Sequence, residues 1–369
     1  MRRTLLTCSA VLALVALLPS AAAAGMSDPG SAASSAAAFS APVVAAAGRF
    51  DDLSVVVDTN GHVHIAATRR GDIWYLTNRT GTWSEHRVMA SGRSVDYAGA
   101  LVALDADGRV FIAATRLKGP GIPWSEGIDL VTDRGRSPGS FSSPSRVTSN
   151  AVLASNLKIV HGHPALVLEI YQCCAANGPN LLWYQIRTRA GWSRQLIDAH
   201  GIGASMRLDP GTGLPVIAYR ALNQIRLATA TSIAGDFRHE MVPGSLGLDS
   251  SPSLALDTAG DPSVFWFSWA AYDVRLAGKT AAGWSMETIP KLSPDGWGSF
   301  EVDTLNRPHI VWYDEESHAL SDRRQHGATW TTRTIASGTS FFNLTARRAP
   351  GGRVVVVWTT EKAIFVSAG

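Results

Sequence analysis

Six segments of this chain share one pattern of four short apolar runs, separated by residues that favour turns. The clearest is "SLALDTAGDPSVFWF…DVRLAGKTAAGWSMETI" (253–289). The other five span residues 53–88, 101–147, 157–197, 206–242 and 299–335. Repeats that begin roughly 50 residues apart indicate an array, because a single four-run unit cannot bury both of its apolar faces. The pattern therefore favours an all-β fold with one four-stranded sheet per repeat.

Two features recur inside these repeats. A D-x-x-G turn, or a close variant, joins the first two runs, and Asp and Gly both serve such turns directly. We therefore predict a structural role for the aspartates, which are Asp58, Asp105, Asp209, Asp257 and Asp303. An aromatic residue opens each fourth run. These residues are Trp83, Phe141, Trp192, Phe237, Trp284 and Trp330.

The last repeat is incomplete, since "LTARRAPGGRVVVVWTTEKAIFVSAG" (344–369) has three runs and no fourth. Its missing run resembles the beginning of the repeat region, where "FSAPVVA" (39–45) matches the fourth-run segment "FSSPSRV" (141–147). A β-propeller closes its ring when an N-terminal strand completes the last sheet, which leaves no open edge at the seam. The sequence therefore predicts a seven-bladed β-propeller with this closure. A six-bladed ring is the alternative.

The turn between the third and fourth runs carries a weak family signature. "RRQHGATW" (323–330) ends in G-x-T-W, and "NRTGTW" (78–83) and "TAAGW" (280–284) keep parts of the same ending. The repeats lack the Gly-His and Trp-Asp signatures of WD40 repeats and the double glycine of kelch repeats. They resemble the BNR or Asp-box propellers of the sialidase superfamily. The F-R-I-P tetrapeptide of sialidases is absent, so the resemblance implies the architecture and not sialidase activity.

The N-terminal residues have the features of an export signal. Arg2 and Arg3 precede an apolar run from Leu5 to Leu18, and small residues follow at 22–24. This order is typical of a cleaved signal peptide, and the apolar run is short for a membrane span. We predict a signal peptide at 1–24, a disordered tail at 25–38 and a single propeller domain at 39–369. Export by the general or the twin-arginine route stays open.

The composition agrees with a secreted bacterial protein. The chain has five lysines and 28 arginines, and no long run of either that would indicate a nucleic-acid interface. We expect a monomer without a cofactor, with no nucleic-acid partner and no membrane contact after signal cleavage.

The ends of the second runs suggest an anion-binding site. Three second runs end in Arg69, Arg116 and Arg220, and another ends in Asp314. In a propeller these ends share one face with the connections between blades, and variable loops on a rigid scaffold often carry function. Guanidinium groups bind carboxylates and sulfates through paired hydrogen bonds, so we predict an acidic glycan as the ligand. The alternative is that these arginines are solvated or pair with nearby carboxylates.

Other residues expected on this face suit carbohydrate chemistry. Tyr97, Tyr171 and His200 are candidate acid–base groups for a lyase, together with Asp314. A hydrolase would use two carboxylates instead. The candidates are Asp314, Glu315, Glu316, Glu169, Asp96 and Asp295. Aromatic candidates for sugar stacking are Trp124, Trp269, Tyr272 and Trp297. The connecting loops differ between repeats, which favours a single enzymatic site, whereas a non-catalytic sugar-binding or scaffold propeller stays open.

Only Cys173 and Cys174 remain after signal cleavage. An oxidising location favours a disulfide between these neighbours over two free thiols. A metal site is less expected there, because two adjacent cysteines without a spaced partner make a poor zinc ligand set.

Overall fold

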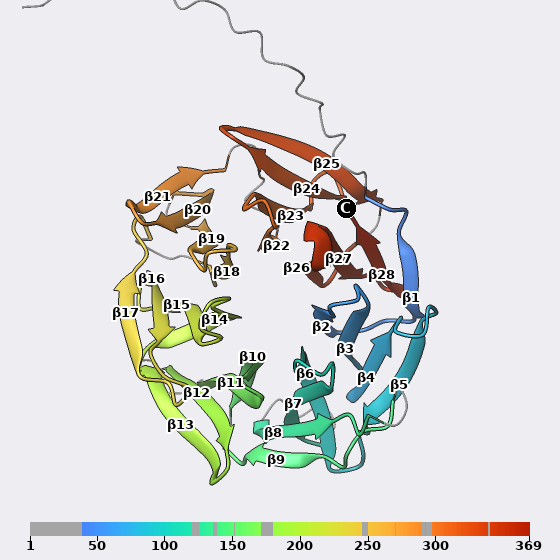
Figure 1. Cartoon of the computed structure of the whole chain (residues 1–369). Coiled ribbons are helices and arrows are strands. Elements are labelled where there is room, and N and C mark those ends of the chain that lie inside the picture. The colour runs from blue at the N-terminus through green and yellow to red at the C-terminus, as the bar shows by residue number, and fades with distance from the viewer. Residues whose placement is uncertain are drawn as a thin grey trace, which may run out of the picture. The chain divides into compact units, whose positions relative to one another are not determined.

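The computed structural model describes residues 39–119, 125–135, 139–150, 152–170, 180–245, 250–269, 271–289, 292, 297–338 and 340–369. The chain divides into two units, residues 1–37 and 38–369, and all the described residues lie in the second. This unit contains seven four-stranded sheets, so the predicted all-β propeller with seven blades is confirmed and the six-bladed alternative is excluded (Figure 1). Among the described residues, the one helical element is a 3-10 turn at Pro350–Gly352, and no helix is long and apolar enough to span a bilayer.

Each blade is an antiparallel sheet whose strands follow one another in sequence. Blade 1 contains β2 (Asp52–Val57), β3 (Val63–Arg69), β4 (Asp72–Thr77) and β5 (Ser84–Met89). Blade 2 contains β6 (Val95–Leu104), β7 (Val110–Lys118), β8 (Ser125–Thr132) and β9 (Ser145–Thr148). Blade 3 contains β10 (Leu153–Val160), β11 (His163–Ile170), β12 (Leu181–Thr188) and β13 (Gly191–Asp198).

The remaining blades follow the same order, except for the last. Blade 4 contains β14 (Gly201–Leu208), β15 (Pro215–Ala221), β16 (Gln224–Ala230) and β17 (Phe237–Met241). Blade 5 contains β18 (Ser253–Leu256), β19 (Pro262–Ser268), β20 (Asp273–Thr280) and β21 (Gly283–Thr288). Blade 6 contains β22 (Trp297–Val302), β23 (Pro308–Asp314), β24 (Ala319–His326) and β25 (Thr329–Ser337). Blade 7 contains β26 (Leu344–Arg348), β27 (Val354–Thr359), β28 (Ala363–Ala368) and β1 (Val43–Ala47).

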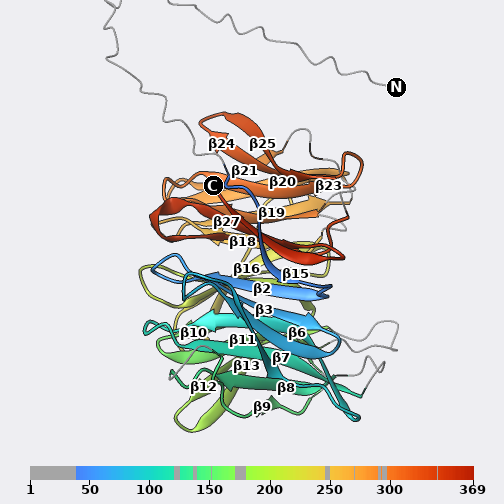
Figure 2. The same ribbon diagram turned by 90° about the vertical axis from the view of Figure 1, so that its right-hand side faces the viewer.

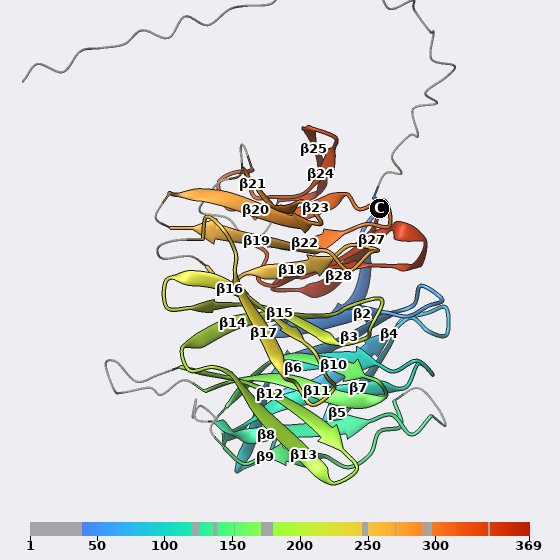
Figure 3. The same ribbon diagram turned by 60° about the vertical axis from the view of Figure 1, so that its left-hand side comes forward.

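The first strand of each blade lies at the centre of the ring. These inner strands contact one another in the order β2, β6, β10, β14, β18, β22 and β26, and β26 contacts β2. Figure 3 shows the yellow-green sheet of blade 4 between the sheets of blades 3 and 5. Apolar clusters fill the space between neighbouring blades, so the core is divided into seven interblade layers.

The two ends of the described chain meet in blade 7. Strand β1 pairs antiparallel with β28, with Val43 opposite Val366, and Figure 2 shows the blue strand beside the dark red ones. Phe39, just before β1, packs into the apolar layer between blades 6 and 7. The aromatic residues that open the other fourth strands pack into the corresponding layers before their own blades. Phe39 therefore completes the aromatic series, which explains the likeness of segment 39–45 to segment 141–147.

Polar side chains on the inner strands connect one blade to the next. In each case a side-chain oxygen accepts a hydrogen bond from a backbone N–H of the following inner strand. The pairs are Ser54 with Val102 (3.2 Å), Asn156 with Met206 (3.0 Å), Ser205 with Leu254 (3.1 Å) and Ser299 with Ala346 (2.9 Å). These bonds satisfy backbone donors that no neighbouring strand could reach at the centre of the ring.

The aspartates of the D-x-x-G turns have the structural role predicted for them. Asp58 Oδ1 accepts hydrogen bonds from the backbone N–H groups of Asn60 and His62, both at 2.8 Å. Asp105, Asp209, Asp257 and Asp303 make the equivalent bonds within their own turns. These turns form one face of the ring, called the turn face below.

Candidate functional site

The opposite face, called the loop face, carries the connections between the second and third strands of each blade and those between successive blades. Arg69 ends β3, Arg116 and Arg220 lie near the ends of β7 and β15, and Asp314 ends β23. Several predicted site residues fall outside the described residues. These are Tyr171, Trp124, Asp295, Cys173, Cys174 and the side chain of Trp297.

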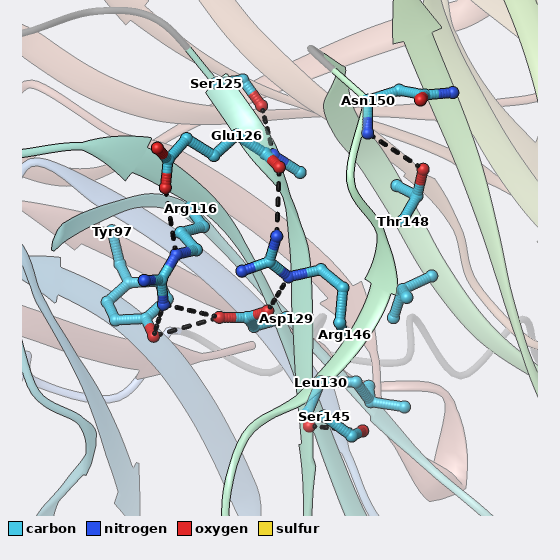
Figure 4. Close-up of polar contacts among 12 residues, drawn as sticks. Tyr97, Arg116, Ser125, Glu126, Asp129, Leu130, Ser145, Arg146, Thr148 and Asn150 are labelled. Atoms are coloured by element: carbon cyan, nitrogen blue, oxygen red, sulfur yellow. Dashed lines mark hydrogen bonds and ion pairs between the residues drawn. The ribbon is translucent and has the colours of Figure 1, made fainter.

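The structure brings together two of the predicted residues, Tyr97 and Arg116, in blade 2 (Figure 4). They lie opposite each other on β6 and β7, and Arg116 Nη1 donates a hydrogen bond to the Tyr97 hydroxyl oxygen at 3.5 Å. The hydroxyl donates in turn to Asp129 Oδ2 at 3.1 Å. Only 5% of Tyr97 is exposed, so its ring belongs to the apolar layer between blades 1 and 2.

Asp129, on β8, is the centre of this cluster. Its Oδ2 also accepts from Arg116 Nη1 at 3.4 Å, and its Oδ1 accepts from Arg146 Nε at 2.6 Å. Arg116 Nε donates to Glu126 Oε2 at 3.3 Å. The two guanidiniums are therefore balanced by two carboxylates and held in fixed orientations. The side chains of Arg116 and Arg146 keep 25% and 37% of their surface exposed, so both remain accessible from the loop face.

The surroundings shift the pKa values of two members of the cluster. Burial, followed by the charge of Asp129, raises the pKa of Tyr97 above its usual range. Burial lowers the pKa of Arg116, but its hydrogen bond to Glu126 and the charges around it outweigh that effect and raise the pKa overall. Tyr97 therefore keeps its proton, which it can donate, but the raised pKa makes it a weaker acid than an exposed tyrosine.

A pocket of about 630 Å³ opens on the loop face, where β1 leads into β2 and β3 turns into β4. It is lined by Gly48, Arg49, Asp51, Arg69, Arg70, Asp72 and Trp74. Arg69 forms an ion pair with Glu85, and its guanidinium carbon lies 3.8 Å from the centre of the Trp74 ring. Stacking and ion pairing together hold Arg69 rigidly at the pocket wall.

Arg70 occupies an unusual backbone conformation beside this pocket. Arg70 and Gly71 form the two-residue turn between β3 and β4, with φ values of 54° and 78°. The left-handed region is uncommon for a residue with a side chain and costs about 1–2 kcal/mol. Within the described part of the chain, the Arg70 side chain makes no hydrogen bond or ion pair. The Gly71 carbonyl accepts a hydrogen bond from the Tyr97 N–H at 2.9 Å, so the pocket adjoins the Tyr97–Arg116 cluster.

The three predicted arginines do not form one cluster. Arg69 and Arg116 lie on the adjacent blades 1 and 2, whereas Arg220 lies on blade 4. Asp314, on blade 6, accepts backbone hydrogen bonds from Glu316 and Ser317 at 2.9 and 3.1 Å. Asp314 therefore caps its own turn. Its catalytic role stays a prediction.

Of the remaining described candidates, Asp96 lies on β6 of blade 2 directly before Tyr97, and the others lie on other blades. His200 is exposed in the turn between β13 and β14, and its N–H donates to Asp198 Oδ1 at 2.8 Å. Trp269 is 56% exposed and packs edge-on against Phe267, with 4.5 Å between ring centres. Glu169 is buried and accepts hydrogen bonds from the backbone of blade 4, so this carboxylate connects two blades.

One polar cluster was not predicted from the sequence. The Tyr219 hydroxyl donates to Asp198 Oδ2 at 3.2 Å and lies 3.1 Å from His239 Nδ1, and Arg226 Nη1 donates to the same Asp198 oxygen at 3.3 Å. Tyr219 directly precedes Arg220, so it points to the opposite face of its sheet. Arg220 was singled out because it ends a second run. Side chains alternate between the two faces of a strand, so Tyr219 could have been predicted to lie on the other face of the same strand. Among the described residues, no group of histidine, cysteine and carboxylate side chains is arranged to hold a metal ion.

No family model matches the chain, and no curated protein matches it by sequence. Solved structures do share its fold. An ulvan lyase of polysaccharide lyase family PL25 has a TM-score of 0.62 and 12% identity, covering 87% of this chain and 93% of its own. The same lyase has been solved bound to "-[GlcA(1-4)Rha3S]-".

Two further structures have lower scores. Virginiamycin B lyase from Staphylococcus aureus has a TM-score of 0.57 and 10% identity, covering 89% of this chain and 99% of its own. The polysaccharide lyase Uly1 has a TM-score of 0.54 and 10% identity, covering 85% and 88%. At these identities the likeness shows the propeller fold, and the resemblance to Asp-box propellers remains one of architecture.

Proposed function

We propose that this protein is secreted and acts on an acidic glycan, which binds on the loop face across the pocket beside Arg70 and the adjoining Arg116 cluster. The observation that carries the proposal is the gathering of Arg49, Arg69 and Arg70 around one pocket. Two carboxylates, Asp51 and Asp72, accompany these three guanidiniums. Arg49 pairs with Asp51 and Glu361, and Arg69 pairs with Glu85, so Arg70 is the guanidinium of this pocket that an anionic ligand can engage. Guanidinium groups suit carboxylate and sulfate groups.

The size of the pocket supports a glycan ligand. Pockets that bind small molecules measure about 300–1,000 Å³, and a volume of about 630 Å³ lies within that range. Arg70 contributes a guanidinium at a strained turn and without a partner among the described side chains. Leu222 and Tyr272 have the same left-handed backbone in other turns, so the conformation is a feature of these turns and the support for the site comes from the Arg70 guanidinium.

The adjoining cluster favours lyase chemistry over hydrolysis. A lyase needs a cation against the uronate carboxylate and groups that transfer protons. Arg116 supplies the cation, and Tyr97 supplies a neutral hydroxyl as proton donor. Tyr171 and His200 stay predictions for the second proton-transfer group. A hydrolase needs two available carboxyl groups, but both oxygens of Asp129 already accept hydrogen bonds from Tyr97, Arg116 and Arg146.

A non-catalytic glycan-binding protein is the second candidate. It is favoured by the burial of Tyr97 and by the direction of its hydroxyl, which points to Asp129 rather than to solvent. In that case the cluster orients Arg116 for binding, and no bond of the glycan is broken.

One experiment separates these functions. The mature protein is incubated with a panel of acidic and neutral polysaccharides, and binding, reducing ends and the ultraviolet absorbance of unsaturated uronates are measured. A lyase produces both reducing ends and absorbance, and a hydrolase produces reducing ends alone. A binding protein retains acidic glycans without either product. Equal behaviour toward acidic and neutral polysaccharides would contradict the proposal.

Recovery of the mature chain from the culture medium tests secretion.

A further inference from the structure

The inner strands place four charged residues at equivalent positions around the centre of the ring. Successive blades are connected through Ser54, Asn156, Ser205 and Ser299. Side chains two positions apart in a strand point to the same side, so the residue two positions after each of these points the same way as its connecting residue. This register, called the inner charge layer, contains Lys158, Arg207, Glu301 and Arg347. Its other three members are uncharged. They are Val56, Ala103 and Ala255.

The charged residues interact across the ring. Arg207 Nη2 and Glu301 Oε2 lie 3.3 Å apart. Arg347 donates to the carbonyls of Val55 at 3.0 Å and Ala346 at 2.7 Å. The ammonium of Lys158 is under the electrostatic influence of Arg207, Arg347 and Glu301, but among the described residues it has no hydrogen-bond or ion-pair partner.

Positive charge therefore exceeds negative charge in this layer. Three cations face one carboxylate, and the carboxylate is already paired with Arg207. Burial, followed by repulsion from Arg207, lowers the pKa of Lys158 to about 7 and that of Arg347 to about 10. Lys158, Arg207 and Arg347 are each partly buried. A partly buried charge without a partner loses part of its hydration, and an anion at this position would reduce that cost.

We infer that the inner charge layer is a binding site for a small oxoanion of the sulfate or phosphate class, with the Lys158 ammonium as its main ligand. An ammonium has three donors, and none of those on Lys158 is used within the described part of the chain. Solvent reaches the layer, since 15% of the Arg207 side chain and 8% of the Glu301 side chain stay exposed. The site shares no residue with the loop-face pocket, so it does not depend on the proposed function.

The test compares sodium sulfate with sodium chloride at equal ionic strength, using the whole mature chain. Calorimetric titration and thermal unfolding are measured for the wild type, for Lys158→Met and for Lys362→Met, a control in the exposed turn between β27 and β28. Sulfate should raise the Tm of the wild type and of the control more than chloride does. In Lys158→Met this extra stabilisation should fall to the general effect that sulfate has on folded proteins. Sulfate should also bind about tenfold more weakly, because a charge-assisted hydrogen bond is removed.

A second measurement protects the test from a folding artefact. Without an oxoanion, Lys158→Met should have a higher Tm than the wild type, since it removes an unpaired, partly buried charge and keeps an alkyl chain of similar length. Lys158→Gln serves if the methionine variant does not fold. Equal effects of sulfate and chloride on the wild type would overturn the proposal, as would unchanged sulfate binding by the folded Lys158 variant. A sulfated monosaccharide in the same titration distinguishes a glycan ester from the free anion, since the ester binds tighter only if the sugar contributes.

Discussion

Arg207 and Glu301 form an ion pair between blades 4 and 6, two blades that are not neighbours in the ring. The inner strand between them contributes Ala255 at the equivalent position, whose short side chain leaves the two longer ones free to meet. The pair therefore adds a direct connection across the centre to the contacts between adjacent blades. Glu301 is also the one carboxylate that offsets the cations of the inner charge layer.

Replacement of Glu301 by Gln should destabilise the fold strongly. The change leaves Arg207, Lys158 and Arg347 without a counter-charge, and removal of one partner of a buried ion pair costs about 3–5 kcal/mol. We expect a loss near the lower end, about 3 kcal/mol, because Arg207 keeps some contact with solvent. Denaturant unfolding in chloride buffer measures it. The control is Glu361→Gln, which breaks the exposed pair with Arg49 and should cost less than about 1 kcal/mol. Equal losses for both variants would contradict a special role for the inner pair.

Stability should rise with pH between about 7 and 10.5 because of Lys158. Its pKa falls from 10.5 in the unfolded chain to about 7 in the folded protein, so over this window the unfolded state binds more protons. Under that condition the free energy of unfolding increases with pH, and below pH 7 the lysine is protonated in both states and adds no slope. Thermal unfolding of the wild type and Lys158→Met across this window provides the check. The difference between the two Tm curves should narrow as the pH rises, and a constant difference would refute the assignment.

Arg69→Ala and Arg116→Ala should each weaken binding or turnover of an acidic glycan, whereas Arg220→Ala, on blade 4 and outside the proposed site, should have a smaller effect. Loss of one charge-assisted contact corresponds to about 1.5–3 kcal/mol, or about tenfold to a hundredfold in affinity. Arg70→Ala should show a similar loss with little change in stability. Arg109→Ala and Arg353→Ala are the controls, since both arginines are exposed in turns of the turn face. If all variants bind every acidic glycan equally well, the loop-face arginines are only solvated surface.

Tyr97→Phe separates the two candidate functions. The change removes a hydroxyl that bonds to Asp129 and keeps the buried ring, so the expected loss of stability is about 1 kcal/mol. A lyase that uses Tyr97 as proton donor should lose most of its turnover, with little change in affinity for the glycan. Tyr184→Phe is the matched control, because its buried hydroxyl bonds to the carbonyl of Ile233 at 3.3 Å. Turnover that survives in Tyr97→Phe would assign the residue to positioning Arg116 instead.

Deletion of residues 39–48 should lower the Tm sharply, whereas deletion of residues 25–36 should have little effect. The first deletion removes β1 and Phe39, which exposes the edge of β28 and opens the apolar layer between blades 6 and 7. The second deletion removes only residues from the predicted tail. Thermal unfolding of the two shortened proteins decides the matter, and equal melting temperatures would count against a structural role for β1.

The repeated pattern was enough to predict the number of blades. Alternating apolar residues, turn aspartates and one aromatic residue per repeat each have a local physical cause, so they are visible without a structure. The side chains of Ser54, Asn156, Ser205 and Ser299 accept hydrogen bonds from the next blade, and these bonds were not predicted. Serine and asparagine occur in strands for many reasons, so their presence does not indicate a bond between blades.

The site was only partly predictable for a related reason. Register along the strands placed Arg69 and Arg116 at the same face, but it could not show that Arg116 meets Tyr97 and Asp129 or that Arg69 stacks on Trp74. Contacts between Arg207 and Glu301, 94 positions apart, depend on how the ring curves. That curvature follows from packing between the sheets, which a local pattern does not contain.

A ring whose last blade combines β1 with β26, β27 and β28 sets an order of events during synthesis. Ser40 and Ser367 lie 327 positions apart and are hydrogen-bonded, so β1 can pair only after β28 has been synthesised. Until then β1 has no partner strand, and a strand of another molecule can pair with it. Closing so long a loop is a slow, entropically costly step. A chain without β28 would therefore contain the strands of blades 1 to 6 complete, but β1 would have no partner and blade 7 would stay open.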